Sequence, residues 1–139
     1  MENALKKLVR DFIAALDRQD WKAVKETVSP GCRSRIGGQT LDRDGWLAMG
    51  QGFYAGFPDG KHQIDALLNE GDEVVMRCRW SGTHTAAFNG IPATGKRVEL
   101  GLITTYKITD GRIVEHNGQF DSIGMMQQLG VFPAGGPNG

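Results

Sequence analysis

The sequence has few cysteines, no excess charge of either sign and no long apolar run, and each absence excludes a class of protein. Its two cysteines, Cys32 and Cys78, are isolated and lack CxxC spacing, which favours buried free thiols over a disulfide framework. The 16 Lys+Arg residues balance 16 Asp+Glu, so no charge surplus indicates binding to nucleic acid or to an anionic membrane. The expected partner is an apolar small molecule or a second copy of the chain.

No apolar stretch reaches the about 18 residues that a membrane-spanning helix needs. The N-terminus, MENALKKLVRDF, is amphipathic and carries acidic residues, unlike a secretory leader, so we expect a cytoplasmic protein. A length of 139 residues suits one domain. We predict this domain over residues 1–130, followed by a flexible Gly/Pro tail over 131–139.

Helices are expected in the first part of the chain. The first is predicted from apolar residues at helical spacing, namely Leu5, Leu8, Val9, Phe12, Ile13 and Leu16. Asp20 is expected to cap a short second helix, which Ser29-Pro30-Gly31 ends. A third helix should begin after Thr40 or Asp42 and end at Pro58. Its apolar face would consist of Trp46, Met49, Phe53 and Phe57.

From residue 61 onward apolar residues alternate with polar ones, which predicts four long antiparallel strands that share one inner face. A three-residue loop over residues 70–72 would place His62 near Trp80. We also expect a three-residue loop over residues 109–111. It would pair Tyr106 with Val114, Thr104 with His116, and Leu102 with Gly118.

A two-residue Asp-Gly turn is rejected at this second loop because it would bring Glu115 opposite Tyr106 and break the apolar face. The resulting inner face consists of Ile64, Leu68, Val74, Met76, Leu100, Leu102, Val114 and Phe120, with His62, Cys78, Trp80, Thr104, Tyr106 and His116 among them. The outer face mixes charged and apolar residues. It suits either solvent or the interface of a homodimer or homotetramer.

The strand that begins the segment IVEHNGQFDSIGMMQQLG carries a single histidine, His116, on an otherwise apolar face. Gly118 leaves space beside it where a side chain would otherwise project. A titratable group on an apolar surface is typical of a small-molecule pocket. Its expected lining is Trp46, Met49, Phe53, His62, Trp80, Thr104, Tyr106 and Gly118.

Five blocks of sequence, in this order and spacing, resemble one known family. They are FYAGFPD (53–59), WSGTHT (80–85), GIPATGK (90–96), ITDGRIVEH (108–116) and FDSIGMMQQLG (120–130). The chain resembles the SnoaL-like polyketide cyclases, within the superfamily of nuclear transport factor 2 and ketosteroid isomerase. The resemblance implies a cone-shaped α+β barrel in which helices pack into a curved, mainly antiparallel sheet around an apolar pocket, usually in a dimer or tetramer.

The resemblance also implies an intramolecular aldol ring closure that needs neither metal nor organic cofactor. In such cyclases an aspartate two positions after the histidine of the IVEH block is the general acid/base, and that position is Gly118 here. An assisting histidine on the preceding strand corresponds to Thr104, and a bulky residue after the block histidine corresponds to Asn117. A glycine cannot transfer a proton, so the departure at Gly118 leaves the reaction open.

Two residues are candidates to replace the missing carboxylate. His116 can act as acid or base near neutral pH, or it can be a buried neutral histidine bonded to Thr104. Asp121 is the second candidate, but it can also be an ordinary helix N-cap that accepts from the amides of Ile123 or Gly124.

The other two histidines have open roles. His62 beside Trp80 suits core packing or chemistry, and His84 suits a solvent-exposed strand end or the pocket mouth. Three histidines without HxH or HExxH spacing do not indicate a metal site, and no cofactor is expected.

Three function classes follow from these residues. The first is a cofactor-independent cyclase or isomerase that acts on a polyketide-like or steroid-like carbonyl compound. The second is a non-catalytic protein that binds an apolar ligand in the same pocket. An epoxide-opening hydrolase is a weaker third class, because it would need an Asp-Arg-Asp set on an inner face that contains neither residue type.

Overall fold

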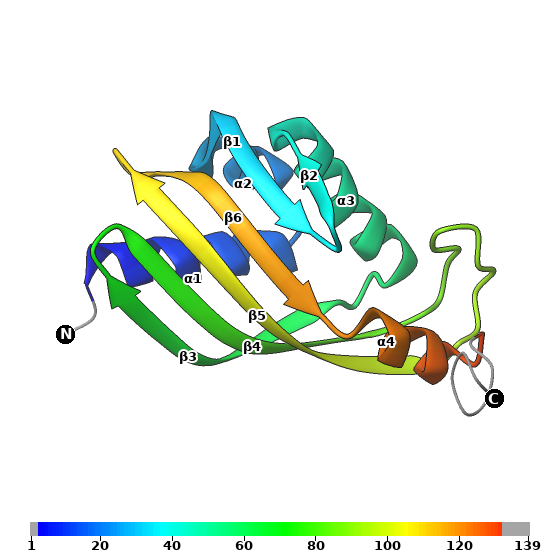
Figure 1. Ribbon diagram of the computed structural model, residues 1–139. Coiled ribbons are helices and arrows are strands. Elements are labelled where there is room, and N and C mark those ends of the chain that lie inside the picture. Colours follow the sequence, from blue (N-terminus) through cyan, green and yellow to red (C-terminus); the bar gives the residue numbers. More distant parts are fainter. Residues whose placement is uncertain (1–2, 132–139) are drawn as a thin grey trace.

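Four helices and six strands follow one another along residues 3–131, the part of the chain that the computed structural model describes (Figure 1). The elements are α1 (Ala4–Asp17), α2 (Trp21–Thr27), β1 (Val28–Ile36), β2 (Gln39–Leu41), α3 (Arg43–Gly56), β3 (Lys61–Glu70), β4 (Glu73–Thr83), β5 (Arg97–Thr109), β6 (Arg112–Phe120) and α4 (Ser122–Leu129). Except for Val131, the tail predicted over 131–139 lies outside the described residues.

Side-chain caps determine where the helices begin. Asn3, Asp20, Asp42 and Asp121 each precede a helix, and each accepts a hydrogen bond from a backbone amide of its first turn. The predicted cap at Asp20 is therefore confirmed. Asp42 is the cap of α3, the second of the two starts that the sequence allowed.

The segment that follows α2 corrects the prediction of four antiparallel strands. Residues 28–41 form β1 and β2, and the sheet is mixed, with the order β2-β1-β6-β5-β4-β3 and β1 parallel to β6. Pro30 obscured this strand because proline cannot donate a ladder hydrogen bond. The register of β1 against β6 indeed shifts between Val28 and Arg33, a segment that includes the proline.

The β3–β4 hairpin confirms one predicted pairing and corrects the predicted loop, because Glu70 pairs with Glu73 across a two-residue turn. His62 lies opposite Trp80, as predicted. The register then shifts between Ile64 and Ala66, which reverses the faces of the following residues. Leu67 is consequently buried in the core, whereas Leu68, predicted to face inward, is 64% exposed.

The β5–β6 hairpin uses the two-residue turn that the sequence reasoning rejected. Asp110 and Gly111 have φ angles of 52° and 75°, which is the left-handed geometry of a type I′ turn. Thr109 pairs with Arg112 across it. A two-residue turn by itself would have reversed the faces of β6.

A bulge restores those faces. The register shifts between Lys107 and Ile108, so that Val114 is the extra residue of β6 and has no partner in the ladder. Ile113 is fully buried in its place, whereas Val114 was predicted on the inner face. The predicted cross-strand pairs are therefore wrong by two residues, and the observed pairs are Tyr106 with His116, Thr104 with Gly118, and Leu102 with Phe120.

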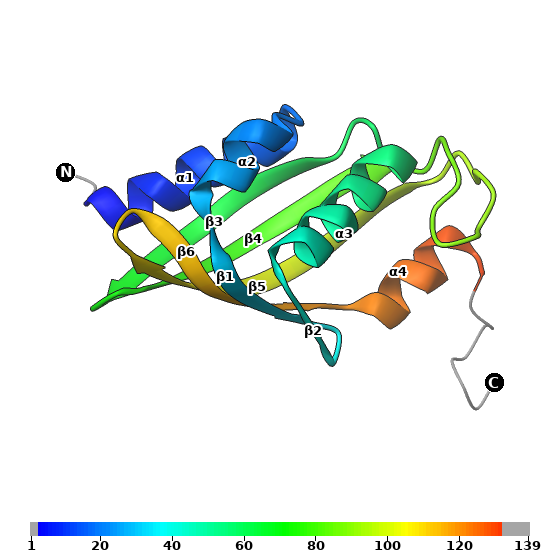
Figure 2. The ribbon, with the colours of Figure 1, turned by 90° about the horizontal axis from the view of Figure 1, so that it is seen from above.

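The helices α1, α2 and α3 lie on one side of the curved sheet (Figure 2). Two clusters of buried apolar residues fill the space between the helices and the sheet, one around Phe12 and Tyr106 and the other around Phe57 and Trp80. The cysteines, Cys32 and Cys78, are buried and free, as predicted. Among the described residues, no helix combines the length and apolar character needed to cross a membrane.

The α+β class and the cone-like arrangement agree with the expected fold.

The β3–β4 turn lies at one end of the sheet, whereas α4 and the loop between β4 and β5 lie together at the other end (Figure 1). That loop contains the tight turn at Asn89 and Gly90, and its Phe88 is buried against the second cluster. A side chain at Gly56 would collide with Phe88, whose Cβ lies 2.8 Å from an ideal Cβ at that position, so the glycine lets the loop approach α3.

Candidate functional site

A partly open cavity of about 140 Å³ lies between the sheet and α1–α3. Its wall is mainly apolar, with side chains from all three helices and from β1, β3, β4, β5 and β6. The structure brings together in this wall the residues singled out from the sequence: Trp46, Met49, Phe53, His62, Trp80, Thr104, Tyr106, His116 and Gly118. Asp121 is not part of it.

His116 is held by two neighbours that come from separate parts of the chain. Its Nδ1 lies 2.8 Å from the hydroxyl of Ser34 on β1, and its ring stacks on Trp46 of α3 at a centroid distance of 4.1 Å. The expected partner, Thr104, is therefore replaced by Ser34. Sequence reasoning missed Ser34 because it did not predict β1, the parallel strand that aligns Ser34 with His116.

Burial controls the charge of His116. The side chain is 4% exposed, and desolvation lowers its pKa to about 3. At neutral pH the ring is therefore a neutral imidazole, with one nitrogen that donates and one that accepts. No partner for its Nε2 is found within residues 3–131.

Gly118 and Thr104 lie beside this imidazole. An ideal Cβ at Gly118 would lie 3.2 Å from Cε1 and 3.5 Å from Nε2 of His116, so a side chain there would contact the ring edge. Thr104, opposite Gly118 in the sheet, has a buried hydroxyl that lies near the hydroxyl of Tyr106 but forms no well-aligned hydrogen bond with it or with any other described residue. A buried hydroxyl without a partner is costly, which marks this point as a place for a polar ligand atom.

Asp121 caps α4. Its Oδ1 accepts a 2.7 Å hydrogen bond from the amide of Gly124, as the structural alternative anticipated. The carboxylate is thus engaged with backbone outside the cavity wall.

His62 belongs to a polar cluster at the cavity wall. Its Nδ1 lies 2.7 Å from Oδ1 of Asp17, and its backbone amide donates to Oδ2 at 2.9 Å. The hydroxyl of Tyr54 donates to Oδ1 at 2.7 Å. Burial by itself would raise the pKa of Asp17, but the hydrogen bonds and charge of His62, together with Tyr54, hold that pKa below its ordinary value of 3.8.

Sequence reasoning missed Asp17, although the chain contains a signal for it. Asp17 is the last residue of α1, where the helix dipole disfavours a negative charge. An acidic residue at that place indicates a compensating partner elsewhere in the fold. The partner is His62, 45 residues further along the chain.

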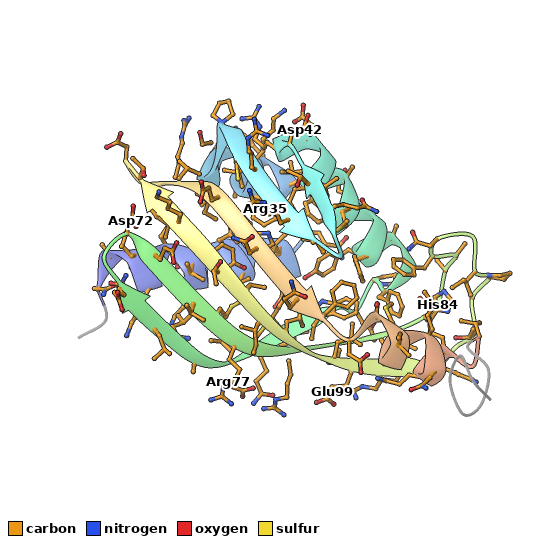
Figure 3. All side chains as sticks on the ribbon, in the orientation of Figure 1. Arg35, Asp42, Asp72, Arg77, His84 and Glu99 are labelled. Carbon is orange, nitrogen blue, oxygen red and sulfur yellow. The ribbon has the colours of Figure 1, made fainter. Side chains whose placement is uncertain are left out.

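His84 lies at the base of the β4–β5 loop (Figure 3). Its side chain is fully buried, its ring stacks on Phe57, and its Nδ1 accepts from the amide of Thr94. It is therefore not solvent-exposed, and it is not part of the cavity wall. Across the described part of the chain, no three His, Cys, Asp or Glu residues converge on a point that would hold a metal ion.

A curved mixed sheet that folds over helices, with an apolar cavity between them, defines a cone-like α+β fold. The chain belongs to the SnoaL-like polyketide cyclase family, whose model matches residues 6–129. This match confirms the family resemblance that the five sequence blocks indicated. No curated protein sequence matches the chain significantly.

Three solved structures illustrate the similarity. IdmH of Streptomyces antibioticus, provisionally described as a polyketide cyclase, is 30% identical, with a TM-score of 0.83 over 93% of this chain and 100% of its own. AclR of Streptomyces galilaeus, provisionally described as a hydroxylase, is 26% identical, with a TM-score of 0.86 over 93% and 97%. TsrD of Streptomyces laurentii is 28% identical, with a TM-score of 0.82 over 95% and 99%.

Proposed function

We propose that the protein binds an apolar carbonyl compound in the cavity and acts on it as a cofactor-independent cyclase or isomerase. One observation carries this proposal. In a mainly apolar wall, two polar atoms near Gly118 have no well-aligned hydrogen-bond partner among the described residues, namely Nε2 of His116 and Oγ1 of Thr104. A few convergent polar groups in an apolar cavity are typical of sites that orient a small molecule.

The ligand's carbonyl oxygen would accept hydrogen bonds at this point. The Thr104 hydroxyl can donate, and Nε2 of His116 can donate in the tautomer in which Ser34 donates to Nδ1. A neutral imidazole with a low pKa suits this role, because it stabilises the negative charge that develops on an enolate oxygen without giving up its proton. Loss of one such donor typically lowers kcat by about 10²- to 10³-fold.

The cavity size limits the ligand. An apolar cavity of about 150 Å³ holds one benzene ring, and this cavity has a similar volume, about 140 Å³. One ring therefore fills it, and a larger polyketide-like compound would extend through the open side. The carbonyl compound should accordingly present a single ring to the inner wall.

Similarity to these relatives does not identify the reaction. The solved relatives include one provisionally described as a cyclase and one provisionally described as a hydroxylase. The preference for carbonyl chemistry comes from two polar atoms of the cavity wall that can donate a hydrogen bond to a ligand oxygen, Nε2 of His116 and Oγ1 of Thr104.

A non-catalytic binding protein is the alternative, and two observations favour it. Gly118 supplies no carboxylate, and an imidazole with a pKa of about 3 is a weak base at neutral pH. Under this alternative the same polar atoms hold the ligand's oxygen without any reaction.

The test compares matched ligands with and without a carbonyl. We expect small cyclic ketones to raise the Tm of the protein, whereas cyclic hydrocarbons of equal size raise it less. Replacement of His116 by Ala should abolish turnover of any ketone substrate while binding persists, with Asp121→Asn as a control outside the cavity. If the wild type binds ketones without turning them over, the protein has the binding function only. If ketones and hydrocarbons raise the Tm equally, the proposal is refuted.

Two broader predictions complete the proposed function. We propose a cytoplasmic location, which cell fractionation would test. We also propose that copies of the chain associate as a homodimer or homotetramer through the outer sheet face, where Arg77 and Glu99 point away from α1, α2 and α3 (Figure 3).

A further inference from the structure

We propose that the cavity has a second polar end at His62 and that its ligand is a hydroxylated carbonyl compound, with the carbonyl oxygen at His116 and Thr104 and a hydroxyl group at Nε2 of His62. This inference rests on the proposed function and narrows it, because it names the class of compound that the same cavity would select. The two oxygens of the ligand would then lie at opposite ends of one ring.

The contact with Asp17 determines which nitrogen of His62 is left for a ligand. The pKa of the Asp17 carboxyl lies below its ordinary value of 3.8, so at neutral pH this group is ionised and can only accept hydrogen bonds. Its Oδ1 lies 2.7 Å from Nδ1 of His62, so Nδ1 carries a hydrogen and donates it to Asp17. Nε2 is the ring nitrogen that remains for another partner.

Nε2 of His62 is open to such a partner. His62 is part of the cavity wall, and its side chain is 11% exposed. Within residues 3–131, Nε2 forms no hydrogen bond and is not among the fully covered polar atoms. A hydroxyl group suits this nitrogen whatever the charge of the ring, because a hydroxyl can donate to a lone pair and can also accept from an N–H group.

The ring of His62 is held in place before any ligand enters. The backbone amide of His62 donates to Oδ2 of Asp17 at 2.9 Å, and the hydroxyl of Tyr54 donates to Oδ1 at 2.7 Å. Elements α1, β3 and α3 therefore meet at one carboxylate. A group that is already oriented loses little freedom when it binds, so more of the hydrogen bond contributes to affinity.

Helix α3 gives the distance between the two polar ends. Its Trp46 stacks on His116. Its Tyr54 contacts His62, with 3.4 Å between the hydroxyl and Nδ1. Residues 46 and 54 are eight positions apart, which at a rise of 1.5 Å per residue is about 12 Å along the helix axis.

The sheet gives a similar distance. His62 lies opposite Trp80, and Trp80 lies opposite Leu100 on β5. Thr104 lies four residues further along β5, which is about 13 Å of strand. Leu102 of the cavity wall lies between these two positions and offers an apolar contact to a ring. Because each hydrogen bond takes up about 3 Å, the two oxygens of the ligand should lie about 6 Å apart.

Three ligands with one ring test this class of compound. The compound 4′-hydroxyacetophenone has a carbonyl and a hydroxyl at opposite ends of its ring, at about the required separation. Acetophenone lacks the hydroxyl, and 4-ethylphenol lacks the carbonyl. We expect 4′-hydroxyacetophenone to bind about 3- to 10-fold more tightly than acetophenone, the usual gain from one hydrogen bond, with Kd measured by calorimetry.

His62→Asn removes the proposed contact and keeps the contact with Asp17. The asparagine amide can donate to Asp17 in the place of Nδ1, but it does not extend to the place of Nε2. This variant should bind the two ketones equally. Thr104→Val is the matched control at the carbonyl end, since it should weaken both ketones and leave their ratio unchanged. A folded His62→Asn that still prefers 4′-hydroxyacetophenone would overturn the inference.

A measurement on the wild type does not depend on whether the variants fold. The ¹⁵N signals of the His62 ring should shift when 4′-hydroxyacetophenone binds and shift less when acetophenone binds, because only the first ligand contacts Nε2. Equal shifts with both ketones would overturn the inference.

The outcomes separate this inference from the function on which it rests. If 4′-hydroxyacetophenone binds more tightly than 4-ethylphenol but no more tightly than acetophenone, the proposed function stands and the role of His62 falls. If 4′-hydroxyacetophenone binds no more tightly than 4-ethylphenol, the carbonyl contact is absent and both fall. Tighter binding than both, with the hydroxyl gain lost in His62→Asn, supports both.

Discussion

Thr104 on β5 lies directly opposite Gly118 on β6. The resemblance to SnoaL-like cyclases implies an assisting histidine at the first position and the acid/base aspartate at the second, so these two of the three departures from the family pattern are neighbours. Together they leave a place beside His116 that contains one hydroxyl and no carboxylate. The chemistry of the cavity therefore differs from that of the implied cyclase at one connected point.

Gly118→Asp should restore a carboxylate at this point. Its Cβ would stand 3.5 Å from Nε2 of His116, and a nearby negative charge favours the imidazolium, so the pKa of His116 should rise from about 3. NMR titration of the ring measures this shift, and a gain of cyclase activity would show that the cavity is otherwise competent. Gly118→Asn is the matched neutral control, and an equal pKa in both variants would contradict the prediction.

His116 should make stability depend on pH in the acid range. Its pKa is about 6.5 when unfolded and about 3 when folded, so between these values the unfolded state binds more protons. The contribution of His116 to the free energy of unfolding is fully present above pH 6.5 and is lost as the pH falls. Where only the unfolded state is protonated, the slope is about 1.4 kcal/mol per pH unit. Urea unfolding at several pH values measures it. In His116→Gln this part of the slope should disappear, and an unchanged slope would refute the assignment.

Asp121 should matter for stability and not for the cavity. Asp121→Ala removes the cap of α4 and should cost about 1 kcal/mol of unfolding free energy, whereas Asp121→Ser, which can also cap, should recover most of it. Ketone binding should be the same in both variants. Weaker binding in Asp121→Ser, despite recovered stability, would indicate a role at the site.

The outer sheet face should control association if copies of the chain meet there. Ile103 is 54% exposed on the central strand β5 of this face. Ile103→Lys would place a charge in the contact and should shift the sedimentation coefficient toward that of the monomer. Ile123→Lys is the control, because Ile123 is 49% exposed but lies on α4. A monomeric wild type, or equal effects of both changes, would exclude this interface.

The sequence predicted the helices more reliably than the strand pairings. The cap at Asp20 depends on residues within one turn, and α1 follows from the spacing of its apolar residues. Strand faces depend on counting residues in steps of two, and a bulge that the pattern does not mark changes the count. The bulges of β3 and β6 thus moved Leu68 outward and Ile113 inward.

By itself the sequence determined the family, the α+β class, the helix cap at Asp20 and the residue types that meet in the cavity wall, because caps and apolar periods act over short distances. The tertiary structure decided which hydrogen-bond partners these residues have. Ser34 reaches His116 over 82 residues of chain, and Asp17 reaches His62 over 45. These contacts, together with burial, make His116 neutral and give His62 its tautomer. No local pattern encodes them, because charge and proton position depend on what surrounds a group in space.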